Sequence, residues 1–346
     1  MRLKGNTMID LPVKRLTIGQ LPLSGSSNPY VDRMADNLRR LGDLHPFPSM
    51  REFTFNPLRV LLRRYDVLIL NWIENAAYNS KGNLSFLRKA RLHVYLAAAK
   101  LIARKVIWVR HNNYPHGVTS LRGRASTKAL LTWMERYADV VITHSPVEAR
   151  GKRKYVPHPL YSTKAADDNP LATQNYFFMF GHMAPYKRLD EVIRLAPPGL
   201  ELVIAGPANN PAYLEKLQSL AQERPNIHLL PGFLDSSVAA RIAKDSRGII
   251  VANADVDMVV SGSYIYALSL NVPLYAVRTP FVSWLDSESG VGGVHVFDTL
   301  ESLLSEVDTV SKEDIRPDPT RVDELFGDKA ILRHLSLALE ITVERV

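Results

Sequence analysis

A turn between an apolar strand and a helix in the second half of the chain could hold a diphosphate. The apolar run Tyr176–Phe180 predicts a strand that breaks at Gly181 and His182. Lys187 and Arg188 follow, and a helix is expected to begin after them. Backbone N–H groups at a helix start attract anions, and a lysine beside them adds a full positive charge. Lys187 could instead be solvated, Arg188 could point elsewhere, and the backbone could satisfy His182.

A second turn, Ser261-Gly262-Ser263, has the same character and directly precedes an expected helix over Tyr264–Leu270. An ordinary N-cap serine with a flexible neighbour is the alternative. One cap needs only one serine, however, and Gly262 permits a ligand to approach the backbone closely. We therefore expect this turn to bind phosphate as well. Together the two turns indicate a nucleotide-diphosphate sugar as the ligand.

Two carboxylates, Asp255 and Asp257, have the Asp-x-Asp spacing that can hold a divalent cation. Oxygen ligands of this kind suit Mg²⁺ or Mn²⁺. A three-residue match arises often by chance, and the lysine and the helix starts already supply positive charge. We therefore predict no metal ion and no cofactor, with the nucleotide sugar as a substrate.

The second half of the chain resembles the donor-binding domain of GT-B glycosyltransferases, similar to family four and to bacterial exopolysaccharide (xanthan-type) mannosyltransferases. In the family-four pattern a strand ends in Gly-Arg-Leu and a lysine follows four residues later; Gly181-His182-Met183 and Lys187 stand at those places. The runs 202–207 and 231–235 resemble the next strand and turn and the loop near the nucleotide base. The resemblance implies that Gly206 and Phe233 also bind the donor.

The chain departs from the family-four pattern at two places. His182 replaces the usual arginine, so one cationic contact to the diphosphate is weakened or absent. Met258 and Tyr266 stand where two glutamates eight positions apart would fall, so a carboxylate contact to the ribose is not assumed. The Ser-Gly-Ser turn is instead similar to that of the xanthan-type mannosyltransferases.

Two residues of the first half are expected at the ligand crevice. His111 follows the predicted strand 105–110 and Glu74 follows the predicted strand 66–71. Residues just past the carboxyl ends of parallel strands face the crevice. The resemblance implies that His111 contacts the donor sugar. Glu74, near Trp72, is expected at the crevice rim as the general base of an inverting transferase, and a surface glutamate without function is the alternative.

The charge is divided unevenly along the chain. Residues 1–160 contain 27 Lys and Arg against 10 Asp and Glu, and the remainder contains 16 against 25, for a formal net charge of +8. Such asymmetry indicates a polyanion or an anionic surface as the partner of the first half. Because no nucleic-acid-binding signature is present, we expect anionic lipid and no nucleic acid. The basic residues on the expected helices are Arg59, Arg63, Arg64, Arg88, Lys89, Arg91, Lys100, Arg104 and Lys105.

Strands alternate with helices along the whole sequence, which predicts an α/β protein with parallel sheets. The length of 346 residues fits two Rossmann-like domains facing across a cleft, the GT-B arrangement. We place an acceptor-binding, membrane-facing domain at 1–165, a donor-binding domain at 166–328, and a helix crossing back to the first domain at 329–346. Strands are expected at 15–21, 66–71, 105–110 and 139–143. Helices are expected at 29–41, with Asn28 as the cap and Pro29 at the first position, and at 84–103 and 126–137.

The sequence has no cysteine, no apolar run of the ~20 residues that span a membrane, and no signal-peptide core at its N-terminus. We expect a cytoplasmic protein attached peripherally to the inner face of the plasma membrane. Its expected activity is metal-independent transfer of mannose, glucose or glucuronic acid from a nucleotide-diphosphate sugar to a lipid-linked saccharide in bacterial exopolysaccharide or glycan assembly. The stereochemical outcome stays open. A GT-B-fold sugar-nucleotide epimerase and a non-catalytic nucleotide-sugar-binding protein are the alternatives.

Overall fold

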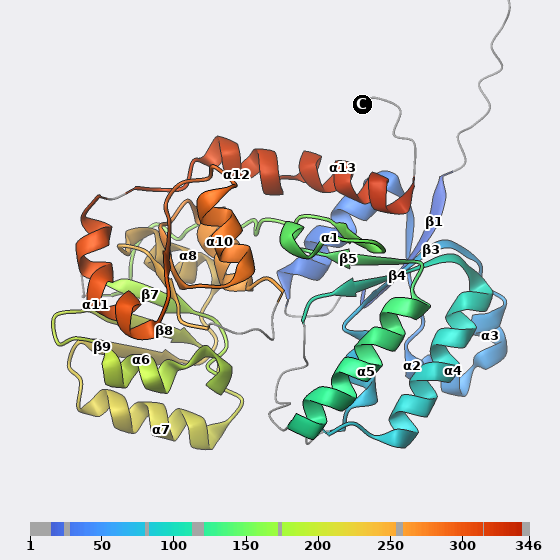
Figure 1. Cartoon of the computed structure of the whole chain (residues 1–346), viewed down its shortest axis with the longest axis horizontal. Helices are drawn as coiled ribbons and strands as arrows, with labels where there is room; N and C mark the ends of the chain where they lie inside the picture. Colours follow the sequence, from blue (N-terminus) through green and yellow to red (C-terminus); the bar gives the residue numbers. More distant parts are fainter. Residues whose placement is uncertain are drawn as a thin grey trace, which may run out of the picture.

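The computed structural model describes residues 15–23, 28–79, 83–112, 121–171, 175–253, 259–313 and 315–340. Within these residues the strands form two six-stranded sheets in the orders β2-β1-β3-β4-β5-β6 and β12-β11-β10-β7-β8-β9. All the strand pairings within both sheets are parallel. Parallel neighbours need crossover connections, which the helices provide (Figure 1). The predicted arrangement of two Rossmann-like α/β domains is confirmed.

The N-terminal domain contains the first sheet. Its strands are β1 (Leu16–Leu21), β2 (Gly42–Pro46), β3 (Tyr65–Asn71), β4 (Ala103–Arg110), β5 (Val140–Thr143) and β6 (Arg153–Tyr155). Its helices are α1 (Pro29–Leu41), α2 (Met50–Phe55), α3 (Pro57–Leu61), α4 (Phe86–Ile102) and α5 (Leu121–Tyr137), with short 3₁₀ turns η1 (Ile73–Ala77) and η2 (Pro146–Glu148).

The C-terminal domain contains the second sheet. Its strands are β7 (Phe177–Phe180), β8 (Leu202–Gly206), β9 (Ile227–Pro231), β10 (Ile249–Val251), β11 (Leu274–Val277) and β12 (Val294–Phe297). The helical elements that follow β6 are η3 (Pro185–Lys187), α6 (Leu189–Leu195), α7 (Pro211–Gln222), α8 (Ser236–Asp245), α9 (Gly262–Leu270), α10 (Pro280–Ser287), α11 (Leu300–Val310), η4 (Ser311–Glu313), α12 (Pro319–Phe326) and α13 (Asp328–Leu339).

The central strand β3 shows why a continuous apolar run forms a strand here. Successive side chains of a strand point to opposite faces. Val67 and Ile69 accordingly enter the hydrophobic core on one face of the sheet, whereas Leu68 and Leu70 enter the core on the other face. A parallel sheet covered on both faces therefore requires apolar residues at consecutive positions.

Helix α1 follows β1 and positions the N-terminal side of the cleft. The Asn28 side chain caps it by accepting a hydrogen bond from the backbone of Tyr30 (3.1 Å), and Pro29 occupies the first turn. Tyr30, Met34 and Leu38 share one face at helical spacing and are buried. The helix and its cap were both predicted from the sequence.

Helix α13 returns from the second sheet to the first domain. Ile331, Leu335 and Leu339 enter the core shared with α1 and the first sheet. The Lys105 ammonium donates to the backbone oxygen of Leu339 (3.1 Å) and pairs with Glu340 (2.7 Å). In Figure 1 this helix lies across the top of the molecule and connects the two domains. The boundary expected between residues 165 and 166 lies between β6 and β7.

Candidate functional site

A pocket of about 450 Å³ lies between the two domains. It is lined by the turn after β7, the loop after β9, the start of α9, the interdomain segment and the first residue of α1. Its lining residues are Pro29, Tyr161, Thr163, Phe180, Gly181, Tyr186, Lys187, Phe233, Leu234, Ser236, Ser261, Gly262, Ser263 and Tyr266. Six residues predicted to bind the donor are thus brought together: Gly181, Lys187, Phe233, Ser261, Gly262 and Ser263.

Two glycines shape the turn after β7. Gly181 has φ +108° and Gly206 has φ +144°, a region that favours glycine. A Cβ on Gly206 would collide with the backbone oxygen of Gly181, so the end of β8 packs directly against the turn. Gly206 therefore supports the turn without lining the pocket. His182, the next residue along the turn, is partly exposed and also lies outside the pocket lining.

The Lys187 side chain lies against this turn and lines the pocket. Its ammonium donates to the backbone oxygen of Phe180 (2.9 Å), and a Cβ on Gly181 would lie 2.7 Å from that nitrogen. Burial lowers the pKa of Lys187 to about 8 because the charged form loses solvation. A phosphate would restore the stabilisation that burial removes, since an anionic oxygen attracts the ammonium more strongly than a neutral carbonyl does.

The start of α9 lies beside the lysine turn in the pocket wall. Ser261 is the N-cap, and its hydroxyl accepts from the backbone of Ser263 (3.3 Å). The Ser263 hydroxyl in turn donates to the Phe180 backbone oxygen (3.5 Å), the same atom that accepts from Lys187. The helix start and the ammonium therefore meet at one point of the pocket. First-turn N–H groups lack partners within a helix, so this wall is suited to an anion.

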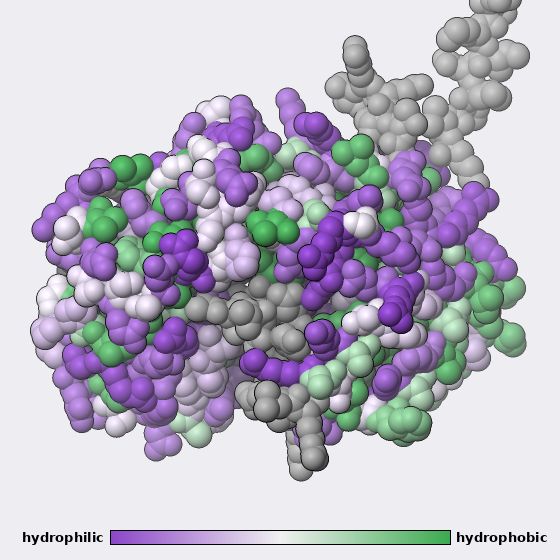
Figure 2. All heavy atoms as spheres, viewed as in Figure 1, coloured by the Kyte–Doolittle hydropathy of each residue, from purple (hydrophilic) through white to green (hydrophobic). Residues whose placement is uncertain are grey.

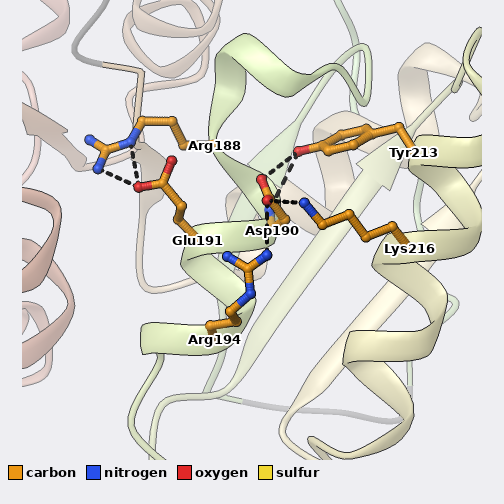
Figure 3. A network of polar contacts seen from close by, with 6 residues as sticks. All are labelled: Arg188, Asp190, Glu191, Arg194, Tyr213 and Lys216. Carbon is orange, nitrogen blue, oxygen red and sulfur yellow. Dashed lines mark hydrogen bonds and ion pairs between the residues drawn. The ribbon is translucent and has the colours of Figure 1, made fainter.

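Arg188 is directed away from the pocket. Its backbone is left-handed (φ 55°), and its guanidinium donates twice to Glu191 (3.1 and 2.7 Å), as Figure 3 shows. The neighbouring Asp190 accepts from Tyr213 (3.1 Å) and Lys216 (2.6 Å) of α7. The Asp190 contacts fasten α6 to α7. The Arg188–Glu191 pair is separate from them, and Arg188 is not among the pocket-lining residues.

Aromatic rings form much of the remaining wall. Tyr266 stacks on Phe180 with ring centroids 4.9 Å apart, and Tyr161 lies 6.3 Å from Tyr266. Phe233 is 86 % exposed beside them. The Tyr266 hydroxyl is buried, and among the described residues it has no hydrogen-bond partner. The aromatic surfaces suit the planar base and the C–H faces of a nucleotide sugar.

His111 links the N-terminal domain to the segment that precedes α9. Its ring stacks on Trp72 with centroids 4.1 Å apart, and Nε2 lies 3.1 Å from Oδ1 of Asn71. Its backbone oxygen accepts from the backbone of Val259 (3.2 Å), two residues before the α9 cap. Burial holds the pKa of His111 well below its usual value, so the ring is neutral. His111 itself is not among the pocket-lining residues.

Two further histidines extend this cluster. The ring centroids of His144 and His158 are 5.3 Å apart, and both pack around Tyr30. Nδ1 of His144 donates to the Val156 backbone oxygen (2.8 Å), so Nε2 can accept from the Tyr30 hydroxyl (3.1 Å). Burial lowers the pKa to about 4 for His144 and to about 3 for His158. The cluster reaches the pocket through Tyr161, which packs on His158.

Glu74 lies at a different depth from the one expected. The sequence placed its carboxylate at the crevice rim, but the side chain is only 2 % exposed. The left-handed backbone of Trp72 (φ 49°) starts η1, in which Oε2 of Glu74 accepts from the Trp108 indole (3.1 Å). Burial raises the pKa of Glu74 to about 7, and the nearby charge of Arg110 opposes that rise. The Trp72 ring is likewise in contact within the protein, since it stacks on His111.

The described part of the chain holds no group of three or more His, Asp or Glu side chains arranged to bind a metal ion. Asp255, Asp257 and Met258 lie outside the described residues. In the same described ranges, no helix is long and apolar enough to cross a membrane.

Several solved structures share this two-domain architecture. A glycosyltransferase from Rickettsia africae superimposes with a TM-score of 0.59 at 11% identity, over 94% of this chain and 98% of the other. AviGT4, a glycosyltransferase of avilamycin A biosynthesis, gives 0.57 at 14% identity over 94% and 97%. TarM gives 0.54 at 10% identity over 79% of this chain, which spans about half of TarM (54%). No protein-family model and no curated protein matches the sequence. The chain has the GT-B fold.

Proposed function

We propose that the protein is a glycosyltransferase that moves a hexose from a nucleotide-diphosphate sugar to a lipid-linked saccharide. The observation that carries the proposal is the meeting of the Lys187 ammonium and the start of α9 at one wall of the interdomain pocket. Two of the structural neighbours support it, because TarM and the O-GlcNAc transferase GtfA were each solved with UDP. Exopolysaccharide or glycan assembly is the process in which we place the reaction.

The pocket would act on the leaving diphosphate. Negative charge develops on that group as the bond to the sugar breaks, and preorganised donors stabilise such charge most effectively away from water. Lys187 and the Ser261–Ser263 turn supply these donors. No metal ion is needed in this scheme, so transfer should persist in EDTA. Loss of activity in EDTA that Mn²⁺ restores would instead assign a metal to Asp255 and Asp257.

We assign the sugar and acceptor side of the reaction to the N-terminal domain. His111 is proposed to contact the donor sugar, because its backbone bonds to Val259, just before the start of α9. Glu74 is the proposed general base if transfer inverts the anomeric configuration. Its pKa of about 7 suits proton transfer near neutral pH. Its burial means that the acceptor hydroxyl would have to reach it through a rearrangement of the crevice.

The lipid-linked acceptor would be met at the cytoplasmic face of an anionic membrane. The excess of basic residues in the first 160 positions supports this orientation, because anionic lipid attracts such a surface. Electrostatic attachment of this kind should weaken as salt rises. Reversing the charges of Arg63, Arg64 and Arg88 should therefore lower turnover on a membrane-borne acceptor while leaving nucleotide affinity nearly unchanged.

The test is a transfer assay with UDP-, GDP- and dTDP-hexoses, with and without a membrane lipid extract. The proposal predicts that one donor yields a glycosylated lipid and free nucleotide diphosphate, and that Lys187→Ala abolishes both products. Conversion of the donor to an isomeric nucleotide sugar without lipid would identify an epimerase. Binding of a donor with no turnover under any condition would identify a non-catalytic binding protein.

A further inference from the structure

Exposed hydrophobic side chains are concentrated on one flank of the N-terminal domain. Among the described residues, seven of the twelve exposed large hydrophobic side chains lie between positions 55 and 101. Their exposed fractions run from 61% to 88%. We define the apolar flank as six of these residues: Phe55, Leu58, Leu62, Phe86, Leu87 and Leu101. Concentrations of this kind mark interaction sites.

The fold presents these side chains on one surface. Helices α2, α3 and α4 contact one another on the outer side of the N-terminal domain (Figure 1). Figure 2 shows hydrophobic residues along the edge of the molecule over α3 and at the lower end of α4, separated by hydrophilic ones. Next to them, a hollow of about 380 Å³ between α2 and α4 includes Phe53, Pro57 and Val94 in its lining.

These exposed residues are not needed to hold the helices to the core. In α4 the inward face is supplied by Leu92, Leu96 and Ala99, which are buried, whereas Phe86 and Leu87 point to solvent. Helix α2 contains no buried residue, yet it exposes Phe55. Both helices therefore display apolar side chains that no described part of the chain covers.

Basic residues predominate around the flank, although α2 carries Glu52 and two basic residues next to Leu101, Lys100 and Arg104, pair with Asp139 and Asp66. Residues 81–105 contain seven Lys and Arg and no Asp or Glu. The guanidinium groups of Arg63, Arg64 and Arg88 donate to backbone oxygens, and among the described residues these three form no ion pair. Exposed helices normally carry charges of both signs, which form pairs along the helix. Apolar side chains within a basic surface are instead typical of helices that lie in a membrane interface.

We propose that the apolar flank inserts into the surface of a bilayer that contains anionic phospholipid. Phe55, Leu58, Leu62, Phe86 and Leu87 enter the boundary between headgroups and acyl chains, while the surrounding guanidinium groups bind lipid phosphates. This adds apolar insertion to the electrostatic attachment described above, and it rests on the proposed function only for the membrane-borne acceptor.

The position of the flank fits delivery of such an acceptor. Helix α4 connects β3 to the parallel strand β4, so it begins on the side of the carboxyl ends of the strands, and in parallel sheets that side faces the ligand crevice. Phe86 and Leu87 therefore lie at the crevice side of the flank, and Leu101 at its far side. A second copy of the chain is a poorer occupant, because the two basic flanks would repel each other.

The insertion is tested by co-sedimentation with vesicles of phosphatidylcholine alone or mixed with phosphatidylglycerol. Two variants remove apolar groups from exposed positions, Leu58→Gln/Leu62→Gln and Phe86→Gln/Leu87→Gln. The matched control, Leu195→Gln/Leu337→Gln, changes exposed leucines of α6 and α13. We expect each flank variant to lower the partition coefficient on mixed vesicles about tenfold and the control to leave it unchanged.

High salt separates insertion from electrostatic attraction. At about 1 M salt the Debye length falls to about 3 Å, so purely electrostatic binding is lost. The proposal predicts that wild-type protein remains partly bound there and that the flank variants do not. Complete release of the wild type, or equal binding of wild type and variants, overturns it. A wild-type dimer in solution that the flank substitutions dissociate would also overturn it, by assigning the flank to self-association.

Nucleotide binding is measured on the same samples. Variants that lose vesicle binding but keep wild-type nucleotide affinity support insertion of the flank and show that the donor site is unaffected. Conversely, a donor affinity that does not depend on Lys187 would refute the proposed donor site and leave the vesicle result standing.

Discussion

At the scale of single residues, Lys187 is the group on which the proposed donor site depends. Its ammonium is partly desolvated, its pKa is lowered to about 8, and it shares the Phe180 carbonyl with Ser263. The free protein therefore holds this lysine charged below about pH 8 and increasingly neutral above it. A neutral amine loses the charge-assisted component of a phosphate contact.

The pH dependence of nucleotide binding should reveal that titration. We expect affinity for nucleoside diphosphates to fall as the pH rises from 7 to 9, measured by calorimetry in matched buffers. In Lys187→Arg the guanidinium stays charged over this range, so any remaining binding should not show the decline. A decline that persists unchanged in the arginine variant would assign the titration to another group.

At the scale of elements, the contact between the turn after β7 and the end of β8 sets the shape of the site. Gly206 combines a left-handed backbone with direct contact to Gly181, so Gly206→Ala should be strained by about 1–3 kcal/mol or more. We expect a lower melting temperature and weaker nucleotide binding by differential scanning calorimetry and titration. The matched control is Gly199→Ala, where an added Cβ meets no atom within 4 Å. Equal melting temperatures for the two variants would show that this contact does not constrain the turn.

The regular elements were largely predictable because their signals are local. The apolar runs gave β1, β3, β4 and β5 and the cap at Asn28 gave α1, each to within a few residues. The edge strands β2 and β6 were missed. The first ends in a proline, and the second is only Arg-Lys-Tyr, with no apolar run to mark it. Their strand character comes from pairing with a neighbour.

The site was predictable only in its local part. The two turns were visible because glycine, serine and lysine stand next to a strand or helix start. The aromatic wall of Tyr161, Tyr186 and Tyr266 was not identified, since these residues are far apart in the sequence and meet only in the folded chain. Burial of Glu74 likewise depends on Trp108, 34 positions away, which no local pattern reveals.

At the scale of the whole molecule, the histidine cluster at the junction between the domains makes the stability of the protein depend on pH. His144 and His158 have pKa values lowered to about 4 and about 3, against about 6.5 for an unfolded histidine. The unfolded chain therefore binds more protons below pH 6.5, and stability is lost as the pH falls from about 6.5 toward 3. Glu74 has the opposite effect, because its pKa is raised to about 7 in the folded chain. Its protonation therefore stabilises the folded chain as the pH falls from about 7 to about 4.

We accordingly expect the melting temperature to fall from pH 6.5 to pH 4. Carboxylates elsewhere contribute to any such loss, so the diagnostic quantity is the difference between wild type and His158→Phe. This variant removes one buried titrating ring and should show a shallower decline, followed by calorimetry across the pH series. An identical slope would mean that His158 does not contribute to the acid sensitivity.

We expect the interdomain pocket to bind a nucleotide-diphosphate sugar through Lys187. Isothermal titration of UDP, GDP and dTDP into wild type, Lys187→Ala and Lys244→Ala tests it most directly, because Lys244 is an exposed lysine of the same domain. Loss of one charge-assisted contact should weaken the preferred nucleotide by about 1.5–3 kcal/mol, roughly 10- to 150-fold, in Lys187→Ala alone. Wild-type affinity in Lys187→Ala, or no binding of any of the three nucleotides to the wild-type protein, would contradict it.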